Sequence, residues 1–168
     1  MPARTVSSEH ASVGRPCSIA AALRIVGEKW SLLAVREISF GNHRFEALAA
    51  NTGGPRDILT TRLRSLEAAG VIRREQYNDT PPRYEYHLTD SGHDLFGVLQ
   101  SLRMWGDKWA VDAAPMRFAH TCGHELDVVP VCRHCDEVAD LAHTTAKSRL
   151  PDWDLAGRRL GTSRTANQ

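Results

Sequence analysis

The 168-residue sequence has no run of the roughly 18 to 20 apolar residues that a membrane-spanning helix requires. Its amino-terminal segment also lacks the hydrophobic core of a secretory signal, so we expect a cytoplasmic protein with no membrane partner. The net charge is only +1, so any surface for nucleic acid must be local. No Gly-rich phosphate-binding pattern and no Ser-His-Asp arrangement is recognisable, and we therefore do not expect an enzyme.

The length favours one modest domain with appendages, since single domains typically contain about 100 to 150 residues. Residues 1–16 show no apolar period and predict a disordered amino-terminal arm. Residues 17–112 carry the helical and strand patterns and predict the main domain. Residues 113–141 form a Cys/His-rich appendix, and residues 142–168 predict a C-terminal segment, with one more helix or a docking segment up to Trp153, and a flexible tail.

A basic amphipathic helix is predicted from Pro55 to Ala69, with Gly70 placed to end it. Its leucines recur at helical spacing and form one buried stripe: Leu59, Leu63 and Leu66. Thr60, Thr61 and Arg64 then face away from the core, where short hydroxyls and a guanidinium suit contacts with base edges and phosphates. The alternative is a solvated helix face without a partner.

The segments around this helix predict a winged helix-turn-helix. A short helix begins at Phe45 and ends at the Gly53-Gly54-Pro55 turn, so two helices flank a tight turn. After Gly70, residues 71–77 and 84–88 predict two strands, and residues 78–82 predict the turn between them. This hairpin is the wing, and Arg74 and Arg83 near its base are expected to contact phosphates. The expected fold class is mainly α with a β-hairpin wing.

A long helix is predicted to begin at residues 89–92 and to carry an apolar stripe with 3-4-3-4 spacing. The stripe comprises Leu95, Val98, Leu102, Trp105 and Trp109. Two heptads are too short to establish a coiled coil, and a helix packed on its own domain remains the alternative. The two tryptophans favour a dimer contact, because large aromatic residues are common where two chains bury surface.

Several motifs in order resemble the HxlR-type winged-helix transcriptional regulators of bacteria, which belong to a MarR-like superfamily. They are Cys17–Leu23, Gly27–Trp30, Arg44–Leu48, Leu59–Glu67, Gly70–Ile72 and Pro81–Thr89. The resemblance covers about residues 17–110. It implies a cytoplasmic homodimer at the bacterial nucleoid that binds an inverted-repeat operator in double-stranded DNA, with a small-molecule or redox signal controlling it.

Carried onto this sequence, the resemblance implies that Thr60, Thr61 and Arg64 contact bases and that Arg56 and Arg83 contact phosphates. Arg62 lies at the edge of the buried stripe, so an ion pair with a nearby acid and a DNA contact are both open. Cys17 stands where some members of the family carry a cysteine that senses oxidants or electrophiles. The alternative is a small residue at the start of the first helix.

The appendix contains three of the four cysteines. Cys132 and Cys135 form a C-x-x-C pair, and Cys122 with His124, or with His120, supplies further donors. Such a set can hold a structural Zn(II) in tetrahedral geometry across a β-hairpin built on residues 126–131. A metal-free hairpin with reduced thiols and a redox dithiol at Cys132 and Cys135 are the alternatives.

Three functions follow from these patterns. The first is a sequence-specific transcription factor. The second is a regulator whose switch is thiol or metal chemistry at Cys17 or at the cysteine cluster formed by Cys122, Cys132 and Cys135. The third is a protein-interaction module that keeps a winged helix without binding DNA, and the exposed Thr60, Thr61 and Arg64 argue against it.

Overall fold

The computed structural model describes residues 15–149 and 154–156. The described chain divides into two compact units, one spanning residues 21–130 and the other comprising residues 15–20, 131–149 and 154–156. Expectations for residues 1–14, for Trp153 and for the tail from residue 157 lie outside the described residues. None of the helices in the described part of the chain is long and apolar enough to cross a membrane.

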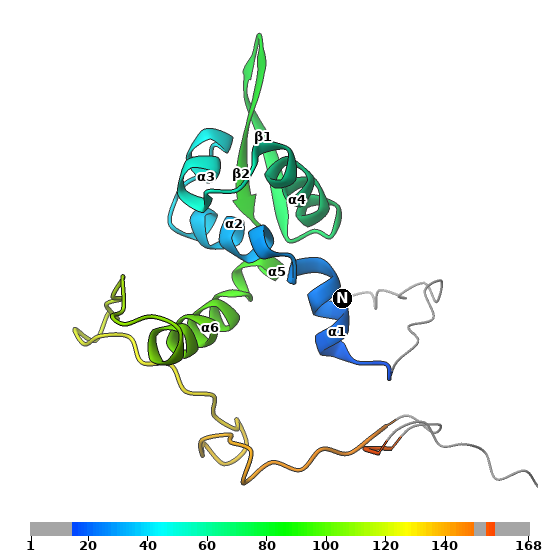
Figure 1. Ribbon diagram of the computed structural model, residues 1–168, viewed down its shortest axis with the longest axis vertical. Helices are drawn as coiled ribbons and strands as arrows, with labels where there is room; N and C mark the ends of the chain where they lie inside the picture. The colour runs from blue at the N-terminus through cyan, green and yellow to red at the C-terminus, as the bar shows by residue number, and fades with distance from the viewer. Residues whose placement is uncertain (1–14, 150–153, 157–168) are drawn as a thin grey trace, which may run out of the picture. The chain divides into compact units, whose positions relative to one another are not determined.

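Six helices and one two-stranded sheet make up the described secondary structure (Figure 1). In chain order they are α1 (Ser18–Val26), α2 (Lys29–Ser39), α3 (Phe45–Thr52), α4 (Arg56–Ala68), β1 (Ile72–Asp79), β2 (Pro82–Leu88), α5 (Asp90–His93) and α6 (Phe96–Trp109). Figure 1 shows α2, α3 and α4 gathered at the base of the β1–β2 ribbon, whose tip extends away from the helices.

The core lies between α2, α3, α4 and the start of β1. Leu59, Leu63 and Leu66 are at most 1% exposed, which confirms the predicted stripe of α4. They pack with Leu48 of α3, with Ile72 of β1 and with the buried face of α2. The predicted end of α4 is also confirmed, because Gly70 adopts a left-handed conformation with φ +72°. This packing fixes which face of α4 remains in solvent.

The wing is a longer hairpin than the sequence indicates. β1 and β2 are antiparallel, with Ile72 opposite Leu88 and Asp79 opposite Pro82. The predicted five-residue turn is wrong, since the connection consists of Thr80 and Pro81 and the flanking polar residues belong to the strands. The strands tolerate these turn-type residues because most of the wing is exposed and has no core face to satisfy.

The structure has two helices after the wing, where the sequence predicts one long helix. Thr89 caps α5, and its hydroxyl accepts a hydrogen bond from the Gly92 N–H, as expected of a helix start. α5 then ends at His93, and α6 begins at Phe96. The Thr89 hydroxyl also contacts the carbonyl oxygens of Gly70 and Val71, at 2.6 and 3.0 Å. These bonds tie α5 to the residues that precede the wing.

The segment after α6 folds back along that helix. The Arg103 guanidinium donates to the Leu126 carbonyl at 3.2 Å, and the Val128 N–H lies 3.4 Å from the Met104 sulfur. The predicted hairpin on residues 126–131 is wrong, because these residues form no strand in the part of the chain that the structure describes. Single bridges join Ala119 to Glu125, and Val131 to Val138, so each closes a separate turn.

The C-terminal segment is irregular where the structure describes it. Residues 142–149 form no helix, so the prediction of a helix there is wrong for this stretch. The stretch has no periodic apolar face that burial could stabilise, and isolated short helices are marginal in water.

Candidate nucleic-acid interface

The exposed face of α4 carries the residues predicted to contact bases. Thr61 and Arg64 are exposed and Thr60 is partly exposed, on the side opposite the three buried leucines. α3 precedes α4 through the Gly53-Gly54-Pro55 turn, and the wing follows it, so this face lies in a helix-turn-helix unit. The arrangement suits insertion of α4 into the major groove of DNA, which admits an α-helix.

The two threonine hydroxyls present acceptors to solvent. The Thr60 Oγ1 donates its proton to the Arg56 carbonyl at 2.7 Å, and the Thr61 Oγ1 donates to the Asp57 carbonyl at 2.9 Å. A hydroxyl that donates to its own helix keeps lone pairs free, and its neighbouring methyl group is apolar. These threonines are therefore suited to accept hydrogen bonds from base amino groups and to contact a thymine methyl.

Two of the arginines that are predicted to contact phosphates already lie against carboxylates of their own chain. Arg56 forms a two-pronged ion pair with Glu46, with N–O distances of 2.7 and 2.6 Å. The hydrogen bond from Arg56 lowers the pKa of Glu46, so this carboxyl stays ionised. The Nε of Arg74 lies 3.5 Å from the Glu67 carboxylate, and its guanidinium stacks over Tyr84. A phosphate must compete with these acids.

Arg64 and Arg83 differ from Arg56 and Arg74 in their carboxylate partners. Both are exposed, and no carboxylate of the described residues forms a salt bridge with either. Arg62 is different, because its Nη2 lies 2.9 Å from the Glu28 carboxylate. Of the two alternatives for Arg62, the structure contains the ion pair.

The base of the wing is joined to the loop between α2 and α3. The Tyr86 N–H donates to the His43 carbonyl at 2.8 Å, and Arg44 bridges to Glu85 both by backbone pairing and by an ion pair of 2.9 Å. The Arg44 guanidinium also stacks over Tyr77. These contacts hold the wing in a fixed direction relative to the helices of its unit.

The apolar stripe of α6 is largely exposed. Val98, Leu102, Trp105 and Trp109 are 50 to 67% exposed, whereas Leu95 packs against the core. α6 contacts the rest of its chain through Leu99, which packs against the core, and through Arg103, which donates to the Leu126 carbonyl at 3.2 Å. At four of its five positions, the stripe predicted for a dimer contact is thus at least half exposed.

The cysteine motifs form two compact turns. In the first, the Gly123 N–H donates to the His120 carbonyl at 2.9 Å, with Gly123 at φ +88°. In the second, the Asp136 N–H donates to the Cys132 carbonyl at 2.8 Å, with Asp136 at φ +56°. All four cysteines are free thiols, and among the described residues no three His, Cys, Asp or Glu side chains are grouped to hold a metal.

Cys17 lies immediately before α1 and is exposed. Hydrogen bonds from the backbone N–H groups of Ala20 and Ile19 lower the pKa of its thiol, and Arg15 adds a smaller electrostatic effect. This is the expected influence of a helix amino terminus on a thiolate.

One feature of the site was not predicted at all. A cavity lies between α2, the base of the wing, α5 and α6, and three of its lining residues are His43, His87 and His93. They come from a loop, a strand and a helix, so no local spacing in the sequence relates them.

The sequence is similar to several known proteins. A family model described as HxlR-like helix-turn-helix matches residues 25–114. The HTH-type transcriptional regulator Rv3095 of Mycobacterium tuberculosis, itself uncharacterized, is 43% identical over 138 residues, which cover 80% of this chain and 84% of that protein. YtcD of Bacillus subtilis, also an HTH-type transcriptional regulator, is 38% identical over 90 residues, covering 53% of this chain and 71% of that protein.

Solved structures show the same fold. PA1607, assigned as a transcription factor, superposes with a TM-score of 0.71 at 28% identity and covers 86% of this chain and 99% of its own. PA1374 from Pseudomonas aeruginosa, with the same assignment, gives a TM-score of 0.57 at 27% identity and covers 85% and 99%. The mycobacterial match is longer than the match of the family model, so the likeness extends beyond residues 25–114.

Proposed function

The chain belongs to the HxlR-like helix-turn-helix family of transcriptional regulators, and we propose that it binds an inverted-repeat operator in double-stranded DNA as a homodimer. It is a regulator and not an enzyme. In this proposal α4 enters the major groove, and Thr60, Thr61 and Arg64 contact base edges. The wing and its Arg83 contact the phosphate backbone beside it, in the cytoplasm at the nucleoid.

The exposed polar face of α4 is the observation that carries this proposal. Its three leucines are buried by α2, α3 and β1, so the helix cannot rotate without exposing them. That constraint leaves Thr60, Thr61 and Arg64 in solvent. A fixed polar face on a helix that follows a tight turn is what base recognition needs.

The exposed stripe of α6 supports the homodimer. Four large apolar side chains at 50 to 67% exposure are costly in water, and a second copy of the same stripe would cover them. A two-fold dimer presents two copies of α4, which matches two half-sites of opposite orientation.

Selection of bound fragments from genomic DNA with the purified full chain tests the proposal. We expect enrichment of one inverted repeat whose half-sites are centred about 10 to 10.5 base pairs apart, or a multiple of that spacing. Analytical ultracentrifugation of the same sample should give twice the chain mass. An absence of enriched sequence would favour the interaction module, and a single unpaired half-site bound by a monomer would contradict the dimer.

The cysteine turns support a separate structural role. We infer that Cys132 and Cys135 bind one zinc ion, and Cys122 and His124 stay the donors that the sequence predicts for the other two positions. Among the described residues no three such side chains are grouped. Thiolates and imidazole are the ligands that structural zinc prefers. His124 is the better histidine, because the Nδ1 of His120 already accepts a hydrogen bond from the Cys122 N–H at 3.3 Å. The left-handed residue after Cys122 and after Cys135 makes each turn tight.

Elemental analysis of protein purified without added metal tests the zinc proposal. We expect about one zinc per chain, lost in the double variant Cys132→Ser and Cys135→Ser. The variant Cys17→Ser is the matched control and should retain the metal. Substoichiometric zinc with thiols that react freely in the native state would overturn the proposal, as would a disulfide between Cys132 and Cys135.

Thiol sensing at Cys17 is a second candidate for the regulation. The exposed thiol with its lowered pKa is the observation that favours it. If Cys17 is the switch, one equivalent of a mild oxidant should change operator affinity in the wild type and leave the Cys17→Ser variant unchanged. An equal response of both proteins would exclude Cys17.

A further inference from the structure

Arg56, the first residue of α4, is held by two neighbouring residues of α3. Its two Nη atoms donate to the two carboxylate oxygens of Glu46, at 2.7 and 2.6 Å. Its guanidinium also stacks over the ring of Phe45, at 4.8 Å from the ring centroid. Phe45 itself packs against the core, so this ring is fixed in place. Together the two contacts fix both the position and the plane of the Arg56 guanidinium.

The pair with Glu46 leaves a second edge of the Arg56 guanidinium free. A guanidinium carries five N–H groups in one rigid plane. The contact with Glu46 uses one N–H of each Nη, and the Nε donates to no acceptor among the described residues. The Nε–H and the remaining N–H of the adjacent Nη are therefore two parallel donors, on a side chain that is 62% exposed. Two parallel donors match the O6 and N7 acceptors that guanine presents in the major groove.

Arg56 lies on the same face of α4 as two residues that are proposed to contact bases. Residues four apart in a helix share a face, so Arg56, Thr60 and Arg64 follow one another along α4. Arg56 occupies the first turn of the helix. The amino-terminal residues of a recognition helix are those that reach base edges. The exposed face of α4 that is proposed to contact bases therefore begins at Arg56.

The carboxylate of Glu46 disfavours a phosphate at the same place. The Glu46 side chain is 76% exposed, and its charge offsets that of Arg56. A protein is attracted to DNA of any sequence by cations that displace counterions from phosphates. An arginine with its own carboxylate contributes little to this attraction, and a phosphate beside it is repelled by the carboxylate. The edge of a guanine carries no net charge, so it is not repelled in this way.

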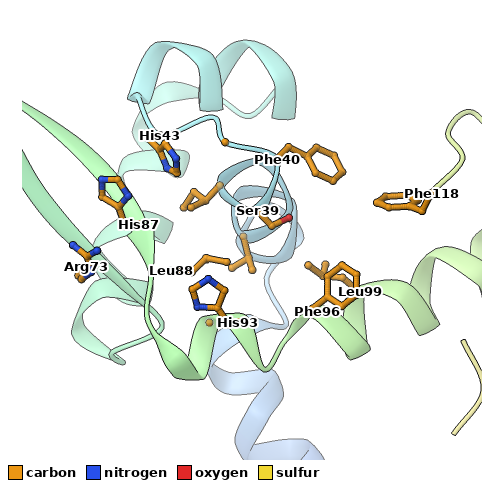
Figure 2. A pocket seen from close by; sticks show the side chains of 14 residues that line it. Ser39, Phe40, His43, Arg73, His87, Leu88, His93, Phe96, Leu99 and Phe118 are labelled. Carbon is orange, nitrogen blue, oxygen red and sulfur yellow. The ribbon is translucent and has the colours of Figure 1, made fainter. Parts of the chain in front are cut away.

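Other arginines that pair with glutamates near α4 and the wing are arranged differently. The Arg62 side chain is only 27% exposed, and Arg73 lines the cavity at the base of the wing (Figure 2). Arg74 contacts Glu67 through its Nε at 3.5 Å, so its guanidinium is not held by two hydrogen bonds. Arg56 is thus an exposed arginine of α4 that both oxygens of one carboxylate hold in place.

We propose that Arg56 contacts a guanine in each operator half-site, and that Glu46 is the positioning residue that holds Arg56 for this contact and away from phosphates. This assignment rests on the proposed function, because it requires α4 in the major groove. Arg56 then contacts a base instead of the phosphate that the family resemblance implies for it. Glu46 raises sequence specificity in two ways, because its charge weakens binding to unrelated DNA and its hydrogen bonds orient the free edge of Arg56.

Selection of bound genomic fragments with the full-length variant Arg56→Lys tests the base contact. Lysine keeps the positive charge but cannot present two parallel donors. For the wild type we expect one guanine in each half-site whose replacement weakens binding about tenfold, and Arg56→Lys should lose most of this preference. Its affinity for a scrambled duplex should stay within about twofold of the wild type, because the charge is unchanged. A base preference identical to that of the wild type would overturn the guanine contact.

The variant Glu46→Gln tests the positioning role. The amide keeps the size of the side chain and removes its charge, so Arg56 becomes free to contact phosphates. We expect tighter binding to the scrambled duplex, a slope of log affinity against log salt that is steeper by about 1, and a weaker preference for the guanine. A slope and a base preference that both equal those of the wild type would overturn the positioning role.

The matched control is Glu125→Gln, which removes the same charge from the segment after α6. Glu125 is exposed and forms no salt bridge among the described residues, so its loss should leave the slope and the base preference unchanged. Exposed ion pairs contribute little to stability, so Glu46→Gln should unfold at about the wild-type temperature. Thermal unfolding followed by circular dichroism measures this, and an equal steepening of the slope in both variants would contradict a specific role of Glu46.

The wild-type selection separates a failure of this proposal from a failure of the proposed function. An inverted repeat that is enriched equally, with the same base preference, by the wild type and by Arg56→Lys would leave the proposed function intact and sink the guanine contact. An absence of any enriched sequence for the wild type would contradict the proposed function and the guanine contact together.

Discussion

Helices α4 and α6 carry apolar stripes of similar spacing, but the chain buries the stripe of α4 and leaves most of the stripe of α6 exposed. The leucines of α4 are at most 1% exposed, whereas Val98, Leu102, Trp105 and Trp109 of α6 are 50 to 67% exposed. Both helices are long enough for three turns or more. An apolar stripe therefore predicts that a helix face is buried, but it does not show whether the same chain or a second chain buries it.

The opposite faces of the two helices complete the comparison. The polar face of α4 is in solvent with Thr61 and Arg64, while Arg103 of α6 contacts a later segment of the chain at the Leu126 carbonyl. One helix is anchored by its apolar side and offers its polar side. The other, α6, is anchored by Leu95, Leu99 and Arg103 and exposes the rest of its apolar stripe, which is the arrangement expected of a helix at a protein-protein contact.

Removing part of the buried stripe of α4 should have the largest effect on stability. Leu63→Ala leaves a cavity in the core and should lower the free energy of unfolding by about 2 to 5 kcal/mol. The matched control is Ile58→Ala on the same helix, where the side chain is 37% exposed and the loss should be much smaller. Denaturant titration followed by circular dichroism measures both, and equal losses would contradict the assigned core.

Truncating the stripe of α6 should act on assembly instead of the fold. Leu102→Ala should weaken the dimer by about 1 kcal/mol for each copy, because a partner can cover only the exposed half of this side chain. Leu141→Ala removes the same atoms from a side chain that is 93% exposed and outside the stripe, so it is the matched control. Sedimentation equilibrium measures the dissociation constants. A dimer equally stable in both variants would show that the stripe is covered by something else.

Changing the polar face of α4 should alter sequence preference. Arg64→Ala should weaken operator binding by about 1 to 3 kcal/mol if the guanidinium makes a two-pronged contact with a base. Binding to unrelated DNA should change far less. Fluorescence anisotropy with operator and scrambled duplexes separates the two, and an equal loss on both would make Arg64 a phosphate contact.

The wing should contribute the smallest and least specific effect. Arg83→Ala should weaken binding to operator and scrambled DNA alike and reduce the slope of log affinity against log salt by about 1. Arg56→Ala is the informative comparison, because its guanidinium is held by Glu46 and should change the slope less. An unchanged slope in Arg83→Ala would remove the wing residue from the interface.

The sequence predicted those parts of the fold that depend on local spacing. Helical period and end signals predicted the buried leucines of α4, the end of α3 at the Gly53-Gly54-Pro55 turn and a helix start at residues 89–92. The structure confirms these three features. The family resemblance is confirmed as well. The break between α5 and α6 was missed, because the start signal at residues 89–92 and the apolar stripe that begins at Leu95 were assigned to one helix.

Long-range pairing could not be predicted from spacing. Arg56 and Glu46 lie ten residues apart on different helices, and their ion pair depends on how the turn orients α3 and α4. The stacked rings of His43 and His87, with centroids 4.4 Å apart, depend on the wing folding over the loop after α2. The cavity lined by His43, His87 and His93 could not be predicted for the same reason. The roles of the DNA-contacting residues and of the cysteines stay predictions.

Gly92 sets how closely α5 approaches the wing. A methyl group on its Cα would collide with the Val71 carbonyl and lie 3.2 Å from the Leu88 side chain. The absence of a side chain at this position therefore sets the distance between α5 and the start of β1. A larger residue there would push α5 away from the wing, and in the proposed dimer the spacing between the two DNA half-sites would change with it.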